Sequence, residues 1–176
     1  MSRVVSPQRD PAYRAGAAAF FLALAAILGA LAAQHVWGIE PCALCFQQRY
    51  AYYAGIPALF IALILVAAEF PRAATLVFFV VALAFLANAG LAAYHSGVEW
   101  KFWPGPDTCS QAPGALKPIG SGGSVLGNLS STRVIRCDEA SWRFLGLSFA
   151  GWNVIASFMI FVAALQAAFA ASTRFR

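Results

Sequence analysis

The third long apolar run of the sequence reads AATLVFFVVALAFLANAGLAAY, from Ala73 to Tyr94. It contains no Lys, Arg, Asp or Glu, and as a helix it is long enough to cross a bilayer, which takes about 20 residues. Hydrocarbon offers the backbone no hydrogen-bond partners, so a run of this kind has to be helical. Its one strongly polar residue, Asn88, is expected to hydrogen-bond to a neighbouring helix.

Three more runs of the same character predict an all-α membrane protein, a four-transmembrane-helix bundle. They cover about residues 15–34, 50–68 and 147–171. The chain is 61% hydrophobic and only 11% charged, whereas a soluble domain carries roughly 25% charged residues. Lipid must therefore cover much of its surface, and we predict a single membrane domain over residues 1–176.

The first run has an alternative reading as a cleaved signal peptide. Ala30-Leu31-Ala32 near its end resembles a cleavage site. However, its apolar stretch is longer than the roughly 7–15 residues of a signal-peptide core. A membrane helix is therefore the preferred interpretation.

Basic residues predict the orientation of the bundle. One side carries six of them in short segments: Arg3, Arg9, Arg14, Arg72, Arg174 and Arg176. The other side carries six spread over two long loops: Arg49, Lys101, Lys117, Arg133, Arg136 and Arg143. The denser side is normally cytoplasmic. We therefore expect both termini inside and two periplasmic loops, about 35–49 and 95–146, so the net charge of +5 need not imply nucleic acid.

Two features predict how the helices pack. The segment Glu69–Arg72 leaves room only for a tight turn, so the helices on either side must be antiparallel neighbours. Ala25, Gly29 and Ala33 recur at four-residue spacing on the first helix, and a stripe of small residues permits close helix packing.

All four cysteines, Cys42, Cys45, Cys109 and Cys137, fall in the expected outer loops. An even number of cysteines in an oxidising compartment indicates disulfides. Neighbouring thiols pair most easily, so we expect Cys42–Cys45 and Cys109–Cys137, although two other pairings are formally possible. A Cys-x-x-Cys ring joins residues that are already close and adds little stability, so redox chemistry explains it better than scaffolding.

Other chemistries fit this cysteine pattern less well, and we predict no metal ligands. A zinc site usually has two close pairs, but Cys109 and Cys137 are far apart in sequence. Attachment of c-type haem needs His after the second cysteine, where this chain has Phe46. A thioredoxin-like site needs strands alternating with helices. Two inert structural disulfides remain an open alternative.

The residues around the Cys-x-x-Cys pair favour a reactive thiol. Pro41 suits the first turn of a helix, and the partial positive charge of a helix N-terminus stabilises a thiolate. In a helix, Arg49 shares a face with Cys42 and Cys45. It can then lower a thiol pKa or stabilise negative charge on a bound electron acceptor. The alternative is an arginine that snorkels to the membrane interface.

The segment PCALCFQQR, residues 41–49, resembles the DsbB family of bacterial inner-membrane thiol oxidases. The resemblance continues in CDEASWRFLGLS, residues 137–148, and in the following Trp152-Asn153. It covers essentially the whole chain, including the order of the helices and the placement of both cysteine pairs. The Gly- and Ser-rich region between Cys109 and Cys137 departs most from the family pattern.

The resemblance implies a relay of electrons through two disulfides. A reduced periplasmic DsbA-like protein of thioredoxin fold attacks the Cys109–Cys137 disulfide and forms a mixed disulfide with Cys109. Electrons then pass to Cys42–Cys45, and Cys45 hands them to a membrane quinone, ubiquinone or menaquinone, beside Arg49. His95 is a candidate donor to a quinone carbonyl, and His35 a weaker one; both also fit as ordinary interfacial histidines.

Two other functions compete with this one. Reductases of the vitamin K epoxide reductase type are also four-helix thiol–quinone enzymes, but they carry their Cys-x-x-Cys late in the bundle. A tetraspan protein with fixed disulfides would have no redox activity. Thiol titration separates it, because structural disulfides stay oxidised below about −300 mV.

Overall fold

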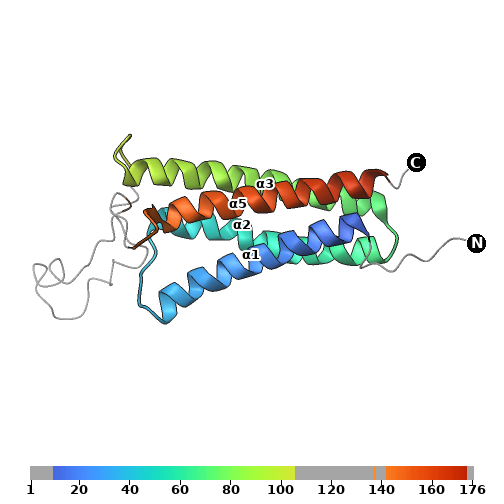
Figure 1. Cartoon of the computed structure of the whole chain (residues 1–176), viewed down its shortest axis with the longest axis horizontal. Coiled ribbons are helices and arrows are strands. Elements are labelled where there is room, and N and C mark those ends of the chain that lie inside the picture. Colours follow the sequence, from blue (N-terminus) through green and yellow to red (C-terminus); the bar gives the residue numbers. More distant parts are fainter. Residues whose placement is uncertain (1–9, 106–136, 138–141, 174–176) are drawn as a thin grey trace, which may run out of the picture.

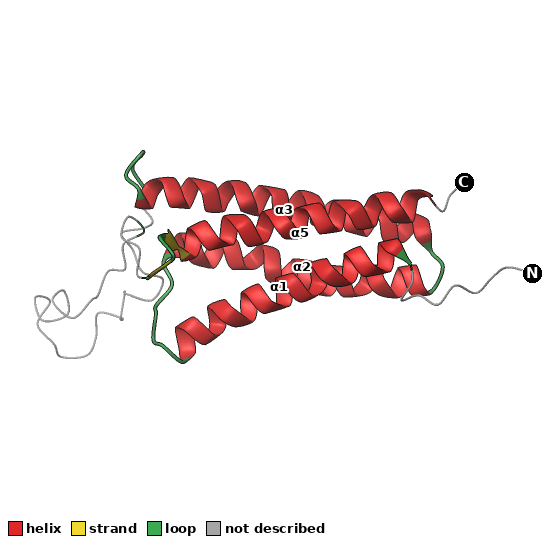
Figure 2. Cartoon of the chain, in the orientation of Figure 1, coloured by secondary structure: helices red, strands yellow, loops and turns green. Residues whose placement is uncertain are grey.

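The computed structural model describes residues 10–105, 137 and 142–173, and four long helices form its bundle (Figures 1 and 2). They are α1 (Pro11–His35), α2 (Ala43–Ala67), α3 (Pro71–Glu99) and α5 (Phe149–Ser172). By length and composition, each is apolar enough to cross a membrane. The predicted all-α membrane bundle is therefore confirmed.

Two helices extend further than expected at the cysteine end of the bundle. α2 begins at Ala43 rather than near residue 50, and α3 continues to Glu99 rather than ending near Tyr94. The apolar runs give way to polar residues at these points, which is why the adjoining segments were predicted to be loops. In the structure, Gln48, Arg49 and His95 are buried on the inner faces of the helices, so the helical backbone continues through them.

A short antiparallel hairpin leads into α5. Its strands are β1 (Arg143–Phe144) and β2 (Leu147–Ser148), and Gly146 takes a φ of 83° in the turn between them. The Ser148 hydroxyl then accepts a hydrogen bond from the Gly151 N–H and caps the helix. The last helix therefore begins at Phe149, two residues later than predicted.

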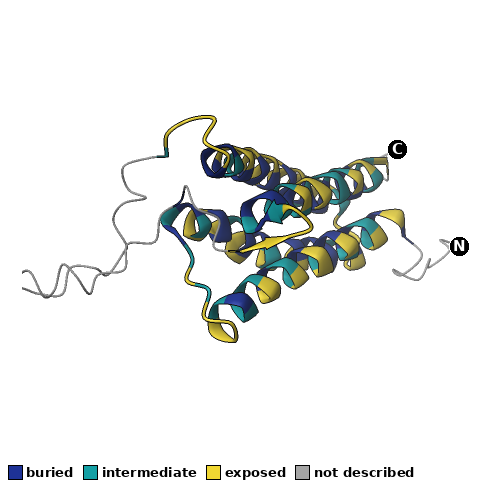
Figure 3. Cartoon of the chain, turned by 60° about the vertical axis from the view of Figure 1, so that its left-hand side comes forward, coloured by how far each residue is buried: buried dark blue, intermediate teal, exposed yellow. Residues whose placement is uncertain are grey.

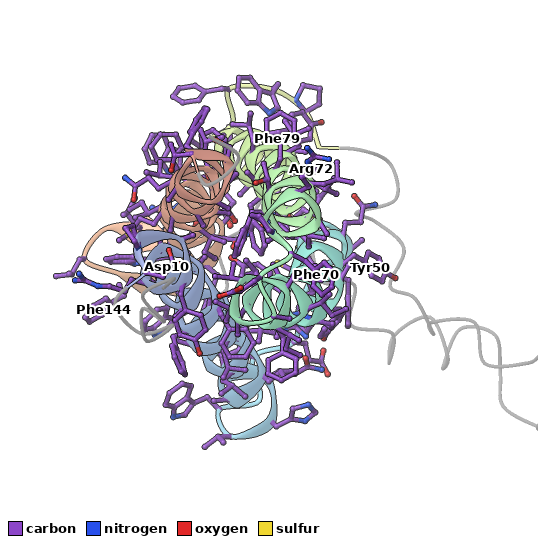
Figure 4. All side chains as sticks on the ribbon, turned by 90° about the vertical axis from the view of Figure 1, so that its right-hand side faces the viewer. Asp10, Tyr50, Phe70, Arg72, Phe79 and Phe144 are labelled. Atoms are coloured by element: carbon purple, nitrogen blue, oxygen red, sulfur yellow. The ribbon has the colours of Figure 1, made fainter. Side chains whose placement is uncertain are left out.

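The two ends of the bundle differ in what they carry. The start of α1, the α2–α3 turn and the end of α5 lie together at one end (Figure 1). Figure 4 looks onto this end, with Asp10, Phe70 and Arg72 labelled. The α1–α2 connection, the end of α3 and the β hairpin lie at the opposite end, so the cysteine motif is separated from the basic turn by the length of the helices.

Large aromatic and aliphatic residues fill the centre of the bundle, where Phe78, Phe85, Leu59 and Ile160 are fully buried. α5 packs against α3 and α1, and α2 packs against the same two helices. Exposed residues form long stripes on the outer faces of the helices (Figure 3). Many of these are large and apolar, such as Phe21, Leu76 and Phe169, as lipid contact requires.

Close helix contacts occur at different glycines from those the sequence indicated. A Cβ on Gly16 would lie 2.6 Å from Phe78, and one on Gly55 would lie 2.6 Å from Phe85. Gly29 has nothing within 4 Å of such an atom, and Ala25 is exposed. The predicted close packing along Ala25, Gly29 and Ala33 is therefore wrong, since only Ala33 is buried.

Asn88 fulfils its predicted role in helix association. Its side-chain Nδ2 donates to the Ser157 hydroxyl of α5 at 2.9 Å, and both residues are buried. Each polar group thereby satisfies the other inside an apolar bundle, where an unpaired one is costly.

The Gly55 contact predicts a specific loss of stability. We expect Gly55→Ala to lower the free energy of unfolding by about 1–3 kcal/mol, because the new methyl group overlaps the ring of Phe85. Thermal unfolding in detergent measures the change. Gly90→Ala is the matched control, since nothing lies within 4 Å of a Cβ there. Equal stability of the two variants would contradict the packing argument.

Candidate functional site

Cys42 and Cys45 face each other at the first turn of α2. Cys42 is the N-cap residue, and its sulfur accepts a hydrogen bond from the Cys45 backbone N–H at 3.4 Å. The two Sγ atoms are hydrogen-bonded at 3.0 Å, about 1 Å longer than a disulfide bond. Both are free thiols here, where the sequence predicted a disulfide. Pro41 precedes the cap and is not part of the helix.

Cys137 comes close to this pair although it lies far away in sequence. It is disulfide-bonded, and since Cys42 and Cys45 are both free, neither of them is its partner. Cys109 lies outside the described residues, so the Cys109–Cys137 pairing stays a prediction. The sulfur atoms of Cys137 and Cys42 lie within 4.8 Å of each other and of a ring nitrogen of His95.

The surroundings of Cys42 favour its thiolate. The hydrogen bond with Cys45 is the largest influence, and the hydrogen bond with His95 acts in the same direction. Together they outweigh burial and lower the pKa of Cys42 from 9.0 to about 4. Because Cys42 then carries the charge, Cys45 is the thiol that donates to it. A thiolate is the nucleophilic form of cysteine, and a sulfur with a low pKa is also a good leaving group.

His95 joins the thiols to α3. It is one of the fully buried residues, and its Nε2 lies 3.6 Å from the Cys42 sulfur and 3.8 Å from Glu99 Oε1. Its other ring nitrogen, Nδ1, lies 3.0 Å from Nε2 of Gln48 on α2. The Glu99 carboxylate is also buried, and its Oε2 has no hydrogen-bond partner among the described residues.

A column of polar groups continues from His95 into the membrane-spanning part of the bundle. Asn153 of α5 donates from Nδ2 to Gln48 Oε1 at 2.6 Å. The hydroxyls of Tyr52 and Ser157 both donate to Asn153 Oδ1, at 2.5 and 3.3 Å. This column, together with Asn88, connects α2, α3 and α5.

Arg49 is positioned by α1 rather than by the thiols. Its Nη1 donates to Gln34 Oε1 at 2.6 Å, its Nη2 donates to the Ala30 carbonyl at 3.5 Å, and the guanidinium lies 5.3 Å from the centre of the Phe46 ring. It does share a helix face with Cys42 and Cys45, as predicted. However, the side chain of another helix that contacts the Cys42 sulfur is His95, while the hydrogen bonds of Arg49 go to Gln34 and Ala30.

These groups open into one cavity of about 390 Å³. One wall is the small-residue face of α1, and Trp142 and Trp152 stand near the hairpin. The polar lining comes from Cys42, Cys45, Gln48, Arg49, Tyr52, His95, Glu99 and Asn153, with Glu40 from the α1–α2 connection. Such a volume, mostly apolar with a few converging polar groups, is typical of a small-molecule site.

The structure brings together most of the residues singled out from sequence and leaves one apart. Cys42, Cys45, Arg49 and His95 line the cavity, whereas His35 is exposed at the end of α1. Sequence reasoning missed Gln48 and Glu99. The signal for Glu99 was present, because an acidic residue one turn after a histidine lies on the same helix face.

Comparison with known proteins gives one match. Residues 13–167 match the family described as Disulfide bond formation protein DsbB. No curated protein and no solved structure matches the chain. The match covers most of the chain, including most of each helix and the positions of all four cysteines. The chain therefore belongs to the DsbB family of membrane oxidoreductases that act in disulfide bond formation.

Proposed function

We propose that the protein reoxidises a periplasmic thioredoxin-fold dithiol protein of the DsbA type and passes the electrons to a membrane quinone. The cysteine end of the bundle then faces the periplasm of a bacterial inner membrane, and both termini face the cytoplasm. The distribution of basic residues supports this orientation. The observation that carries the proposal is the position of Cys42, whose sulfur is hydrogen-bonded to that of Cys45 and lies within 4.8 Å of that of Cys137.

In the proposed relay, each step exchanges one disulfide for another. The partner's dithiol reduces Cys109–Cys137 and leaves as a disulfide. The Cys137 thiolate then attacks Cys42 of the Cys42–Cys45 disulfide, which forms Cys42–Cys137 and releases Cys45. Attack of Cys109 on Cys137 restores the first disulfide and leaves Cys42 and Cys45 reduced.

The cavity has the chemistry that a quinone head group requires. A quinone is flat and apolar, with two carbonyl acceptors, and it accepts two electrons and two protons when it is bound beside a dithiol. The small-residue wall of α1 suits a flat ring, and Arg49 provides guanidinium donors in the same cavity as Cys45. Held by Gln34 and Ala30, Arg49 has a fixed position from which to bind a carbonyl oxygen.

The proposed activity is tested by turnover of purified protein with ubiquinone and a reduced thioredoxin-fold protein. We expect catalytic oxidation of the partner, with one quinone consumed per disulfide formed. Cys45→Ser is expected to abolish turnover, because the released thiol that reduces the quinone is lost. Unchanged turnover in Cys45→Ser, or turnover that does not require quinone, would contradict the proposal.

The open wall of the cavity allows a steric test of the quinone site. We expect Gly29→Leu to raise the KM for quinone by roughly tenfold without unfolding the protein, because its side chain enters the cavity and meets no packed neighbour. Gly90→Leu is the control, at an equally open position outside the cavity. A selective effect on the KM for the protein partner would instead place the quinone elsewhere.

The low pKa of Cys42 predicts the pH dependence of its reactivity. Its thiolate is present above a pH of about 4 and is lost as the pH falls through that value. Alkylation of Cys42 in the reduced protein should therefore depend little on pH between about pH 6 and pH 8. Cys45→Ala removes the main stabilising hydrogen bond and should move the dependence upward into this range. Mass spectrometry of the alkylated protein measures the extent of reaction at each pH. A wild-type profile centred near the ordinary pKa of a thiol would contradict the prediction.

A further inference from the structure

We infer that a directional chain of hydrogen bonds from α5 through Gln48 fixes the tautomer of His95, so that the ring proton is on Nε2 and faces Cys42. Gln48 and Asn153 are then positioning residues that act on the thiol through His95. The inference rests on the proposed function only in taking Cys42 as the exchanging sulfur.

The orientation of the Asn153 side-chain amide sets the direction of the hydrogen bonds. Its Oδ1 accepts from the hydroxyls of Tyr52 and Ser157, and the Ser157 hydroxyl in turn accepts from Asn88. With its oxygen occupied in this way, the Asn153 amide presents its nitrogen to Gln48 Oε1 at 2.6 Å. Gln48 therefore has only its NH₂ group left to face His95.

The Gln48 amide determines the protonation of the ring. Its nitrogen lies 3.0 Å from His95 Nδ1, and because an amide NH₂ can only donate, Nδ1 must offer a lone pair. A histidine with an unprotonated Nδ1 is neutral and carries its single proton on Nε2. A doubly protonated ring would turn an N–H from Nδ1 toward the Gln48 NH₂ group, which cannot accept it.

The other end of the chain favours the same direction. His95 Nε2 lies 3.6 Å from the Cys42 sulfur and 3.8 Å from Glu99 Oε1, and both groups accept hydrogen bonds when charged. An N–H between them stabilises a thiolate, whereas a bare nitrogen lone pair would repel it. Gln48, Ser157 and His95 are all buried, so reversing one bond would leave donors facing donors in a medium of low dielectric.

The described titratable and charged groups near His95 and Cys42 are Cys45 and Arg49 of α2, Glu40 of the α1–α2 connection, Glu99 of α3, Cys137, and Arg143 of β1, which acts through Glu99. None of these groups bridges Cys42 and the amide of Gln48, whereas His95 contacts both. The fixed tautomer therefore makes His95 a hydrogen-bond donor to Cys42 and not a base that removes its proton.

The chain offers a direct test, because His35 and His95 are its only two histidines. Nitrogen-15 NMR of histidine-labelled protein separates protonated from unprotonated ring nitrogens, and His35→Ala assigns the remaining signals to His95. At neutral pH we expect Nδ1 of His95 to be unprotonated and Nε2 to be protonated. A protonated Nδ1 in the wild-type protein would overturn the inference, whatever the enzymatic activity.

Two variants test the chain of hydrogen bonds. Gln48→Leu removes the donor to Nδ1, so we expect mixed tautomers and a Cys42 thiolate titration raised by about one pH unit. Asn153→Asp cannot donate to Gln48, so the Gln48 amide should turn over and Nδ1 should become protonated. Gln47→Leu is the matched control on the exposed side of α2 and should change neither signal.

Wild-type ring signals in both Gln48→Leu and Asn153→Asp would exclude the positioning role. The result is independent of the proposed function. If the wild-type protein gives the expected ring signals but no quinone-dependent turnover, only the proposed function is refuted. If it turns over with quinone but gives other ring signals, only the hydrogen-bond chain is refuted.

Discussion

The structure depends on one requirement: polar side chains inside a lipid-covered bundle must satisfy one another. Cys42, His95, Gln48, Asn153 and Ser157 do so in a single column that crosses from α2 to α3 and α5. The same column fixes how these helices are turned about their axes, because a rotation would bring its members to the lipid. It also ends at the reactive sulfur, so the contacts that hold the helices together add to the Cys45 hydrogen bond in stabilising the charged form of Cys42.

The position of the Cys-x-x-Cys motif at a helix start explains how one sulfur serves two neighbours. As the N-cap residue, Cys42 lies outside the first turn, which leaves its sulfur accessible to Cys137. Cys45 lies within that turn and faces the cavity. Cys137 and the cavity therefore meet at the same short motif, since the sulfur of Cys42 lies within 4.8 Å of that of Cys137 and both motif cysteines line the cavity.

Much of this arrangement could be predicted from the sequence, and the predictions that were wrong or missing have identifiable physical reasons. Apolar length alone predicts the four helices, and helical spacing correctly groups Arg49 with the two thiols. The start of α2 was placed too late and the end of α3 too early, because Gln48 and His95 resemble loop residues when their buried partners are unknown. Gln48 was missed for the same reason, since its partners lie on α3 and α5, whereas Glu99 could have been found from its spacing to His95 on the same helix. The small residues of α1 were misread because spacing does not show whether a neighbouring helix or a cavity faces them.

The open face of α1 has a consequence for how a ligand is supplied. α1 leans away from the other helices toward its His35 end (Figure 1), where Ala25 and Gly29 are exposed along the cavity wall. A lipid-soluble molecule that enters there never has to leave the bilayer. Its effective concentration is then its mole fraction among the lipids, and its arrival rate is set by lateral diffusion in two dimensions. Occupancy of the site would follow membrane composition and fluidity, and would be insensitive to the volume of the surrounding water.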